Sequence, residues 1–226
     1  MNCESLEDIN IPSGVTDIGA CSFVNTPWLA SQQKKDPLVI INSILIDGNA
    51  CSGAVTIPEN VRVIVGGAFN DDPGLTELTI PETVEKISYG AIDNCEKLKV
   101  IRLRADDPAI YRDYSKLKNC CESIKTALDM LKTKDYSVRL EREVKFPFLI
   151  MEYLHTHDAE LEAFLKKNFS KLMKESITNG DLPMIKALTM TDAFVTKRNI
   201  DKFIQQAVSD AQPQAEAFLK EHKNRI

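Results

Sequence analysis

The chain has 226 residues, of which 43% are hydrophobic and 27% charged, a composition typical of a globular protein with one large or two modest domains. Its net charge of −5 is unevenly distributed, because residues 1–105 hold 14 acidic and 8 basic side chains. Phosphate backbones bind to basic surfaces, so this acidic half argues against nucleic acid as the partner.

The sequence predicts no membrane span. Its longest apolar stretch, residues 38–46, is interrupted by Asn42 and Ser43 and is far shorter than a spanning helix. Residues 1–5 show neither the basic nor the apolar segment of a secretory signal. Two explanations stay open: a cytoplasmic protein, or a surface protein whose chain is cut at a repeat boundary, since Cys3 is the first position of a repeat.

A short phrase returns at a fixed spacing in the first 105 residues. Ile-Pro pairs begin at positions 11, 57 and 80, and the first separation is twice the second, which indicates a 23-residue repeat. Apolar residues recur in columns at the same period: Leu6, Leu29, Leu75 and Leu98; Val15, Leu38, Val61 and Val84; Ile18, Ile41, Ile64 and Ile87; Phe23, Ile46, Phe69 and Ile92. Such columns predict a solenoid in which each repeat buries the apolar side chains of its neighbour.

Each repeat is predicted to hold two extended segments and a turn. The phrase Leu-x-x-Ile-x-Ile-Pro is typical of a short strand that ends at proline, and Val-x-x-Ile predicts a second extended segment. Residues 67–69 (Gly-Ala-Phe) predict a tight turn or a short helical piece that places the phenylalanine in the core. Asn25, Asp71 and Asn94 suit the polar turn positions that close each repeat.

This pattern resembles the BspA-like leucine-rich repeat, whose unit reads roughly Cys-x-x-Leu-x-x-Ile-x-Ile-Pro-x-x-Val-x-x-Ile-Gly-x-x-Ala-Phe. Residues 3–23 match it almost throughout, and a fifth unit begins at Cys95 and ends near Arg104. The resemblance covers about the first 105 residues. It implies a bacterial protein and, for several members of the family, surface adhesion to host proteins.

The second repeat departs from this unit. Lys34 and Lys35 stand where the Ile-Pro phrase is expected, which argues against a regular strand ladder over residues 30–37. The segment resembles the family's irregular unit, with an extended hairpin on residues 38–41 and 44–46. Trp28 in this unit is either an exposed anchor for a partner or a cap on the core, and we favour the cap.

After Pro108 the apolar period changes to three and four residues, which indicates amphipathic helices. We therefore predict an α+β protein: a β-rich leucine-rich-repeat solenoid over residues 1–105, followed by an all-α domain over residues 106–226. The expected helices cover residues 110–132, 147–156, 159–167, 169–179, 182–189, 198–209 and 213–223.

Part of the helical half resembles ankyrin repeats. Residues 179–188 are similar to the link between the two ankyrin helices, where Gly180 suits a left-handed helix end and Asp181 can cap the next helix. A weaker copy occupies residues 209–219, and an unrelated helical bundle is the alternative. Residues 196–224 resemble the helical tail that follows BspA-like repeats in proteins of gut Firmicutes.

The sequence offers little for catalysis. His155 and His157 lie two residues apart and do not share a helix face, and the adjacent Cys120 and Cys121 lack a nearby base. We interpret the six cysteines as small buried free thiols rather than as disulfides or a metal site. No catalytic residue, cofactor or metal is predicted, and the chain is not expected to be an enzyme.

The leading hypothesis is a monomeric, non-enzymatic module that binds another protein. Alternation along the predicted strands turns a set of polar residues away from the core: Glu7, Asp8, Asn10, Thr76, Glu77, Thr79, Lys99 and Arg102. These are the candidate binding residues, although each of them is equally compatible with a merely solvated surface. One alternative is a cytoplasmic scaffold that joins two partners, and another is an enzyme or effector activity in the helical half.

Overall fold

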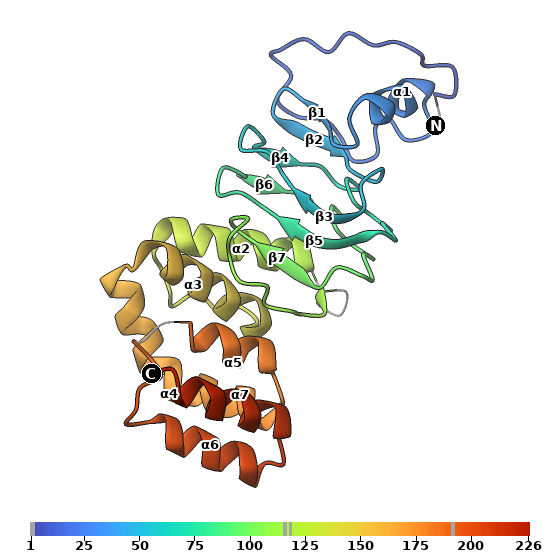
Figure 1. The fold of residues 1–226 in the computed structure, drawn as a ribbon. Coiled ribbons are helices and arrows are strands. Elements are labelled where there is room, and N and C mark those ends of the chain that lie inside the picture. Colours follow the sequence, from blue (N-terminus) through green and yellow to red (C-terminus); the bar gives the residue numbers. More distant parts are fainter. Residues whose placement is uncertain (1–2, 115–116, 118, 191–192) are drawn as a thin grey trace. The chain divides into compact units, whose positions relative to one another are not determined.

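The structure is a computed structural model that describes residues 3–114, 117, 119–190 and 193–226 (Figure 1). The chain forms two compact units. The repeat unit comprises residues 1–106 and 112–129, and the helical unit comprises residues 107–111 and 130–226. The domain boundary that we predict at residue 105 stays a prediction. In the structure, the described part of residues 112–129 groups with the repeats rather than with the later helices.

All described strands of the chain lie in the repeat unit, and they form two sheets. The first sheet has the order β1-β2-β4-β6 and the second has the order β3-β5-β7. The strands are β1 (Val39–Ile41), β2 (Ile44–Asp47), β3 (Gly53–Thr56), β4 (Val63–Ile64), β5 (Leu75–Thr79), β6 (Lys86–Ile87) and β7 (Val100–Arg102). The β1–β2 pair is antiparallel, which confirms the predicted hairpin, and the other pairs are parallel.

The register of the pairs β4–β6 and β5–β7 equals the 23-residue sequence period, whereas β2 and β4 pair at a shorter offset of 19 residues, as in Leu45 opposite Ile64. Ile64 pairs with Ile87, and Leu78 pairs with Ile101, in each case one full repeat further along the chain. Residues at one repeat position therefore become direct neighbours, and their side chains stack into the columns that the sequence predicts. Asp71 and Asn94, which close two of these repeats, both adopt a left-handed backbone conformation, with φ of 58°.

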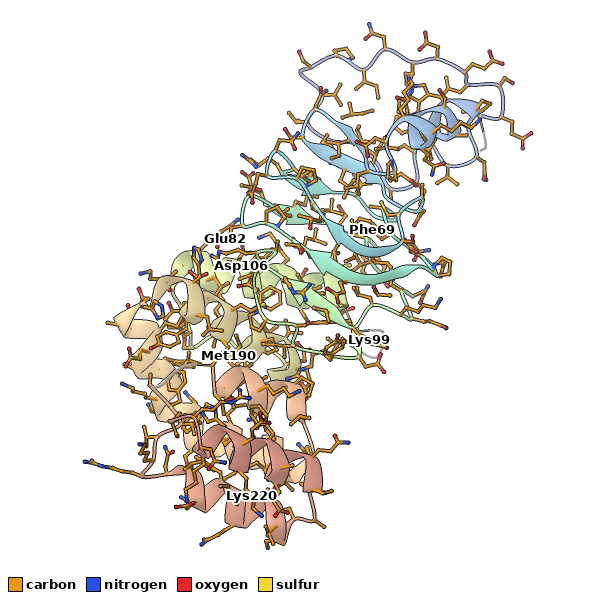
Figure 2. The ribbon with its side chains drawn as sticks, viewed as in Figure 1. Phe69, Glu82, Lys99, Asp106, Met190 and Lys220 are labelled. Atoms are coloured by element: carbon orange, nitrogen blue, oxygen red, sulfur yellow. The ribbon has the colours of Figure 1, made fainter. Side chains whose placement is uncertain are left out.

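The columns form the core of the repeat unit from the third repeat onward, whereas in the second repeat Leu38 and Ile41 are only half-buried. Phe69, labelled in Figure 2, is fully buried, and its ring packs against Gly48 so closely that a Cβ there would lie 2.2 Å from ring carbon Cε1. Further core positions in these columns are Val61, Ile64, Leu75, Val84, Ile87, Ile92 and Leu98. In the first repeat, by contrast, Val15, Ile18 and Phe23 are only half-buried.

Residues 3–26 contain no strand, contrary to the sequence-based expectation for the first repeat. The physical reason lies in the second repeat, where residues 27–35 form helix α1 (Pro27–Lys35) in place of the strand that would pair with it. One backbone hydrogen bond still joins the first two repeats where α1 begins: the Trp28 amide donates to the Leu6 carbonyl at 2.9 Å.

Helix α1 begins where its capping residues dictate. The Thr26 side chain accepts a hydrogen bond from the Leu29 amide, and Pro27 occupies the first turn, where no backbone donor is needed. Trp28 is 5% exposed and its ring lies 4.7 Å from that of Phe23. This burial confirms the core-capping role that the sequence favours for the tryptophan.

The helical unit is built from α-helices that pack against one another. Helix α2 (Cys120–Thr133) begins in the repeat unit and ends in the helical unit. The remaining helices are α3 (Arg142–Thr156), α4 (Ala159–Thr178), α5 (Leu182–Leu188), α6 (Ile200–Ser209) and α7 (Pro213–Lys223). None of the described helices is long and apolar enough to cross a membrane.

The bounds of the first predicted helices differ clearly from those observed. Helix α2 starts at Cys120 rather than at residue 110, because residues 112–114 continue along the repeats, where the Arg112 amide donates to the Lys99 carbonyl at 2.7 Å. Helix α3 starts before Pro147, and the proline lies inside the helix. The two helices expected over residues 159–179 are one continuous helix, α4.

The turn between α4 and α5 confirms a local prediction. Gly180 has a φ of 65°, and the Asp181 side chain accepts a hydrogen bond from the Met184 amide and caps α5. Ala211 takes the equivalent left-handed position between α6 and α7, with a φ of 53°. The two helix pairs therefore share one turn geometry.

Candidate protein-interaction surface

The outward side of the sheet β3-β5-β7 carries several of the predicted binding residues. Its strands are parallel, with Ala54 opposite Glu77 and Glu77 opposite Val100. The next outward row places Thr79 opposite Arg102. Four of the predicted binding residues in this part of the unit stay half-exposed, and we call this group the ladder face: Thr76, Glu77, Lys99 and Arg102.

Two of these residues form an ion pair across neighbouring strands. The Arg102 guanidinium donates to the Glu77 carboxylate, and the two side chains are 17% and 26% exposed. Because both are partly withdrawn from water, the pair is screened less than a fully exposed one. It fixes the orientation of two charges on the surface.

The other two residues are joined through the backbone. The Lys99 amide donates to the Thr76 carbonyl at 3.0 Å, and the Lys99 ammonium donates to the Asp113 carboxylate at 2.6 Å. Lys99 remains at the surface of the repeat unit, where Figure 2 labels it. The positive charges of the ladder face are therefore each paired with a carboxylate, so the surface is polar with little local excess charge.

Thr79 differs from the sequence-based expectation. Strand alternation predicts that it faces solvent, but its side chain is only 7% exposed. The register explains the burial, since it places the longer Arg102 side chain directly beside the threonine. Thr79 therefore has little surface to offer a partner.

The remaining candidates lie elsewhere in the repeat unit. Glu7, Asp8 and Asn10 are exposed, but they belong to the segment that forms no strand. The structure therefore does not bring them into the ladder face. Their role in binding stays a prediction, and the strand register gives it no support because these residues lie in no strand.

Asp113 and the ion pair between Arg104 and Glu82 were not predicted from the sequence. Glu82 and Arg104 are separated by one position less than the repeat period, and this spacing could have indicated that they are neighbours. Asp113 gave none, because its position beside Lys99 depends on residues 112–114 following the last repeat.

The thiols fit a structural role better than a chemical one. Cys95, Cys120 and Cys121 are buried, but Cys3 and Cys21 are exposed, which corrects the expectation that the cysteines are all buried. Burial raises the pKa of Cys95 and of Cys51 to about 11 and also raises the pKa of Cys121. A raised thiol pKa depletes the reactive thiolate at neutral pH.

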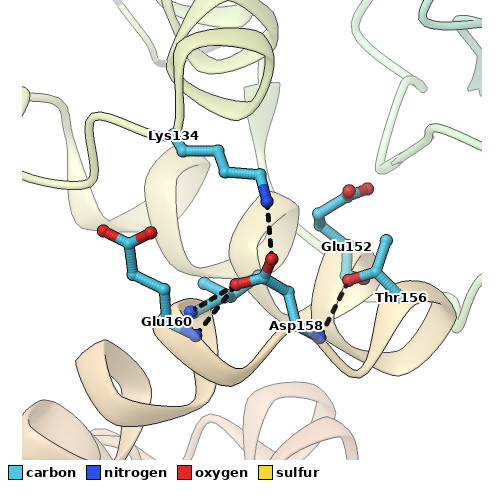
Figure 3. A network of polar contacts seen from close by, with 6 residues as sticks. Lys134, Glu152, Thr156, Asp158 and Glu160 are labelled. Carbon is cyan, nitrogen blue, oxygen red and sulfur yellow. Dashed lines mark hydrogen bonds and ion pairs between the residues drawn. The ribbon is translucent and has the colours of Figure 1, made fainter.

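The histidine segment is organised around a helix start rather than a reactive centre (Figure 3). His157 has a left-handed backbone conformation between α3 and α4. The next residue, Asp158, accepts hydrogen bonds from the Glu160 and Leu161 amides and from the Lys134 ammonium, the last at 2.6 Å. Among the described residues, no group of three or more His, Cys, Asp or Glu side chains could hold a metal ion.

Comparison with known proteins agrees with the strand register. A family model described as a BspA-type leucine-rich repeat region, with six copies, matches residues 1–120. Neither the curated proteins nor the solved structures gave a match. The match covers more than half of the 226 residues, and the chain belongs to the family of proteins with BspA-type leucine-rich repeats.

Proposed function

We propose that this chain is a non-enzymatic protein-interaction module and that its partner docks on the ladder face. The observation that carries the proposal is the 23-residue register, which places Thr76 and Glu77 of one repeat beside Lys99 and Arg102 of the next. Leucine-rich repeats are generally protein-interaction modules, and the family membership supports the same class of function.

The polarity of the ladder face defines the kind of partner. Its charges are already paired within the chain, so a partner has to offer hydrogen bonds and a complementary arrangement of charges rather than a large opposite charge. Such surfaces contribute orientation and specificity more than raw affinity. We therefore expect a protein partner that binds with moderate affinity.

Three finer assignments belong to the same proposal. The BspA type favours adhesion-like binding, and a bacterial surface protein that attaches to a host protein is our specific hypothesis. The equal register of the pairs β4–β6 and β5–β7 favours a continuous solenoid over residues 1–105. The repeated turn at Gly180 and Ala211 favours an ankyrin-like arrangement over residues 106–226.

A scaffold that joins two partners is the second candidate. The division of the chain into two compact units favours it, since each unit has a surface of its own. It predicts that each unit loses one partner when its surface is altered and keeps the other.

A charge exchange within the ladder face tests the leading proposal. In the variant Glu77→Arg with Arg102→Glu, the ion pair is kept and its direction is reversed, so the fold is preserved. After the partner has been identified by cross-linking and mass spectrometry, its affinity for the purified full chain is measured by interferometry. We expect the exchange to weaken binding roughly tenfold, as for other oriented charge pairs at interfaces.

The matched control exchanges an ion pair on the other sheet. Arg62 and Glu85 lie 3.9 Å apart beside β4 and β6, and the variant Arg62→Glu with Glu85→Arg reverses them in the same way. We expect this control to bind like the wild type. Equal loss in the two variants, or no loss in either, would rule out the ladder face as the docking surface.

A further inference from the structure

Helices α4 and α6 run side by side and in the same direction. The rings of Phe169 and Phe203 are 5.7 Å apart, and the Gln206 side-chain amide donates to the Lys174 carbonyl at 3.1 Å. In both contacts the residue of α6 lies 32 to 34 positions after its neighbour in α4. This register brings the outer surfaces of the two helices into one continuous surface.

Exposed cations gather on that surface. Three of them lie on α4 at positions i, i+4 and i+7, which places them on one side of the helix. A fourth, on α6, precedes Gln206 by four positions and so shares the side of α6 that contacts α4, and the fifth stands just before α6 begins. We call these five residues the basic face: Lys167, Lys171, Lys174, Arg198 and Lys202.

The positive charge of the basic face is hardly neutralised. The Lys171 ammonium lies 4.0 Å from the Glu175 carboxylate, which is also engaged by Arg142. The other four cations form no ion pair with any residue that the structure describes. In a chain with a net charge of −5, such a cluster is an attractive site for an anionic partner.

Two further carboxylates border the basic face, besides Glu175. Glu160 is exposed in the first turn of α4, and Asp210 lies at the end of α6. The Asp210 carboxylate accepts hydrogen bonds from Thr178 at 2.8 Å and from Gln206 at 3.2 Å. These two acids repel an anionic ligand that extends beyond the cations. The three lysines of α4 span about 10 Å, which sets the length of a ligand that contacts all of them.

The chemistry of this surface favours a protein partner over other polyanions. Its aromatic neighbours, Phe169 and Phe203, are buried, so they offer no stacking platform for nucleic acid bases. The basic face itself contains only cations, with no apolar side chain to insert into a bilayer. We propose that the basic face binds an acidic segment of a partner protein, in which several carboxylates follow one another within about two helical turns.

Charge reversal on the chain of 226 residues tests the proposal. The test variant is Lys171→Glu with Lys174→Glu, and the control is Lys34→Glu with Lys97→Glu, which changes the net charge equally at exposed lysines of the repeat unit. The probe is a fluorescein-labelled oligoglutamate peptide, and binding is followed by fluorescence anisotropy at low and at physiological salt. Circular dichroism melts confirm that both variants are folded.

We expect the test variant to lose roughly tenfold in affinity for the peptide, while the control binds like the wild type. Wild-type binding should weaken as salt increases, because the charges are exposed. Equal affinity in the two variants would overturn the proposal. It would also be overturned if duplex DNA, or vesicles of phosphatidylcholine with phosphatidylserine, bound at the same lysines more tightly than the peptide.

Discussion

In the repeat unit, buried side chains that touch one another occupy the same position in successive repeats, as Leu78 and Ile101 do. In the helical unit, the aromatic core gathers from separate elements. Phe194, which lies between α5 and α6, stacks on Phe169 at 5.5 Å and contacts Tyr153 of α3 at 5.3 Å. The contacts within the repeat unit can therefore be predicted from the sequence period. The contacts of the helical core cannot, because they join residues that are not separated by a regular spacing.

The same contrast applies to surface charge. On the ladder face, the charges of Glu77 and Arg102 are paired across the repeat register. On the basic face, cations of α4 and α6 lie together without such pairing. We infer that the two units meet their partners differently, one through an ordered polar surface and the other through excess positive charge.

Removing a column side chain should have the largest effect. Phe69 is fully buried, and Phe69→Ala should lower the free energy of unfolding by about 3–5 kcal/mol because it leaves a cavity. Urea denaturation measures the loss. The control is Phe23→Ala, at the same repeat position but half-buried, for which a clearly smaller loss is expected. Similar losses would show that the first repeat is as well packed as the third.

Thiol reactivity gives the next largest contrast. Burial raises the pKa of Cys95 to about 11, two units above its ordinary value, so its thiolate fraction at neutral pH falls about 100-fold. Iodoacetamide labelling followed by mass spectrometry should therefore modify the exposed Cys21 long before Cys95. In denaturant the two rates should converge. Comparable rates in the native chain would contradict the burial of this column position.

A buried lysine supports the helical unit. The Lys145 ammonium donates to the Tyr136 and Val138 carbonyls at 2.8 and 2.6 Å and lies over the Phe164 ring. Lys145→Met should cost about 1–3 kcal/mol, because both carbonyls lose their donor. Chemical denaturation at neutral pH measures the cost. A cost near zero would mean that water replaces the ammonium without penalty.

The pH dependence of the same residue has a defined sign. Burial lowers the pKa of Lys145 below its ordinary value of 10.5, so the unfolded chain binds more protons between the lowered pKa and 10.5. The contribution of Lys145 to stability therefore rises with pH across that window. The stability difference between wild type and Lys145→Met should widen as the pH approaches 10.5. A narrowing difference would contradict the direction of the shift.

The smallest effect is expected at the exposed start of α4. Asp158→Ala removes both the cap and the ion pair with Lys134, whereas Asp158→Asn keeps a capping side chain. Thermal melts should show a modest loss for the first variant and a smaller one for the second. An equal loss would assign the whole effect to the ion pair.

Acid should remove this contribution. The Lys134 ammonium and the amides of α4 hold the pKa of Asp158 below its ordinary value of 3.8. The stabilisation is therefore present above pH 3.8 and is lost as the pH falls through the lowered pKa. Wild type and Asp158→Asn should converge in acid, and a constant difference would speak against the ion pair.

Much of the repeat unit could be predicted because its order is local and periodic. The columns of Leu75 and Leu98 and of Ile64 and Ile87 follow from spacing alone, and the hairpin over residues 38–46 follows from the resemblance to the family's irregular unit. What spacing could not show is that residues 27–35 form a helix, which removes the strand partner of the first repeat. Helix α4 is predicted as two helices, although its buried residues Leu161, Leu165 and Phe169 continue at a helical spacing.

The sequence by itself determined the repeat period, the family and the polar residues that alternate with the core, since a strand turns successive side chains to opposite sides. Tertiary structure alone decided which of these residues share a surface. The strand register sets Arg102 opposite Thr79, which is buried beside it, and the Arg102 side chain reaches Glu77 two positions earlier on the neighbouring strand. The basic face exists only because α4 and α6 pack in parallel, a relation between helices that no short-range pattern contains.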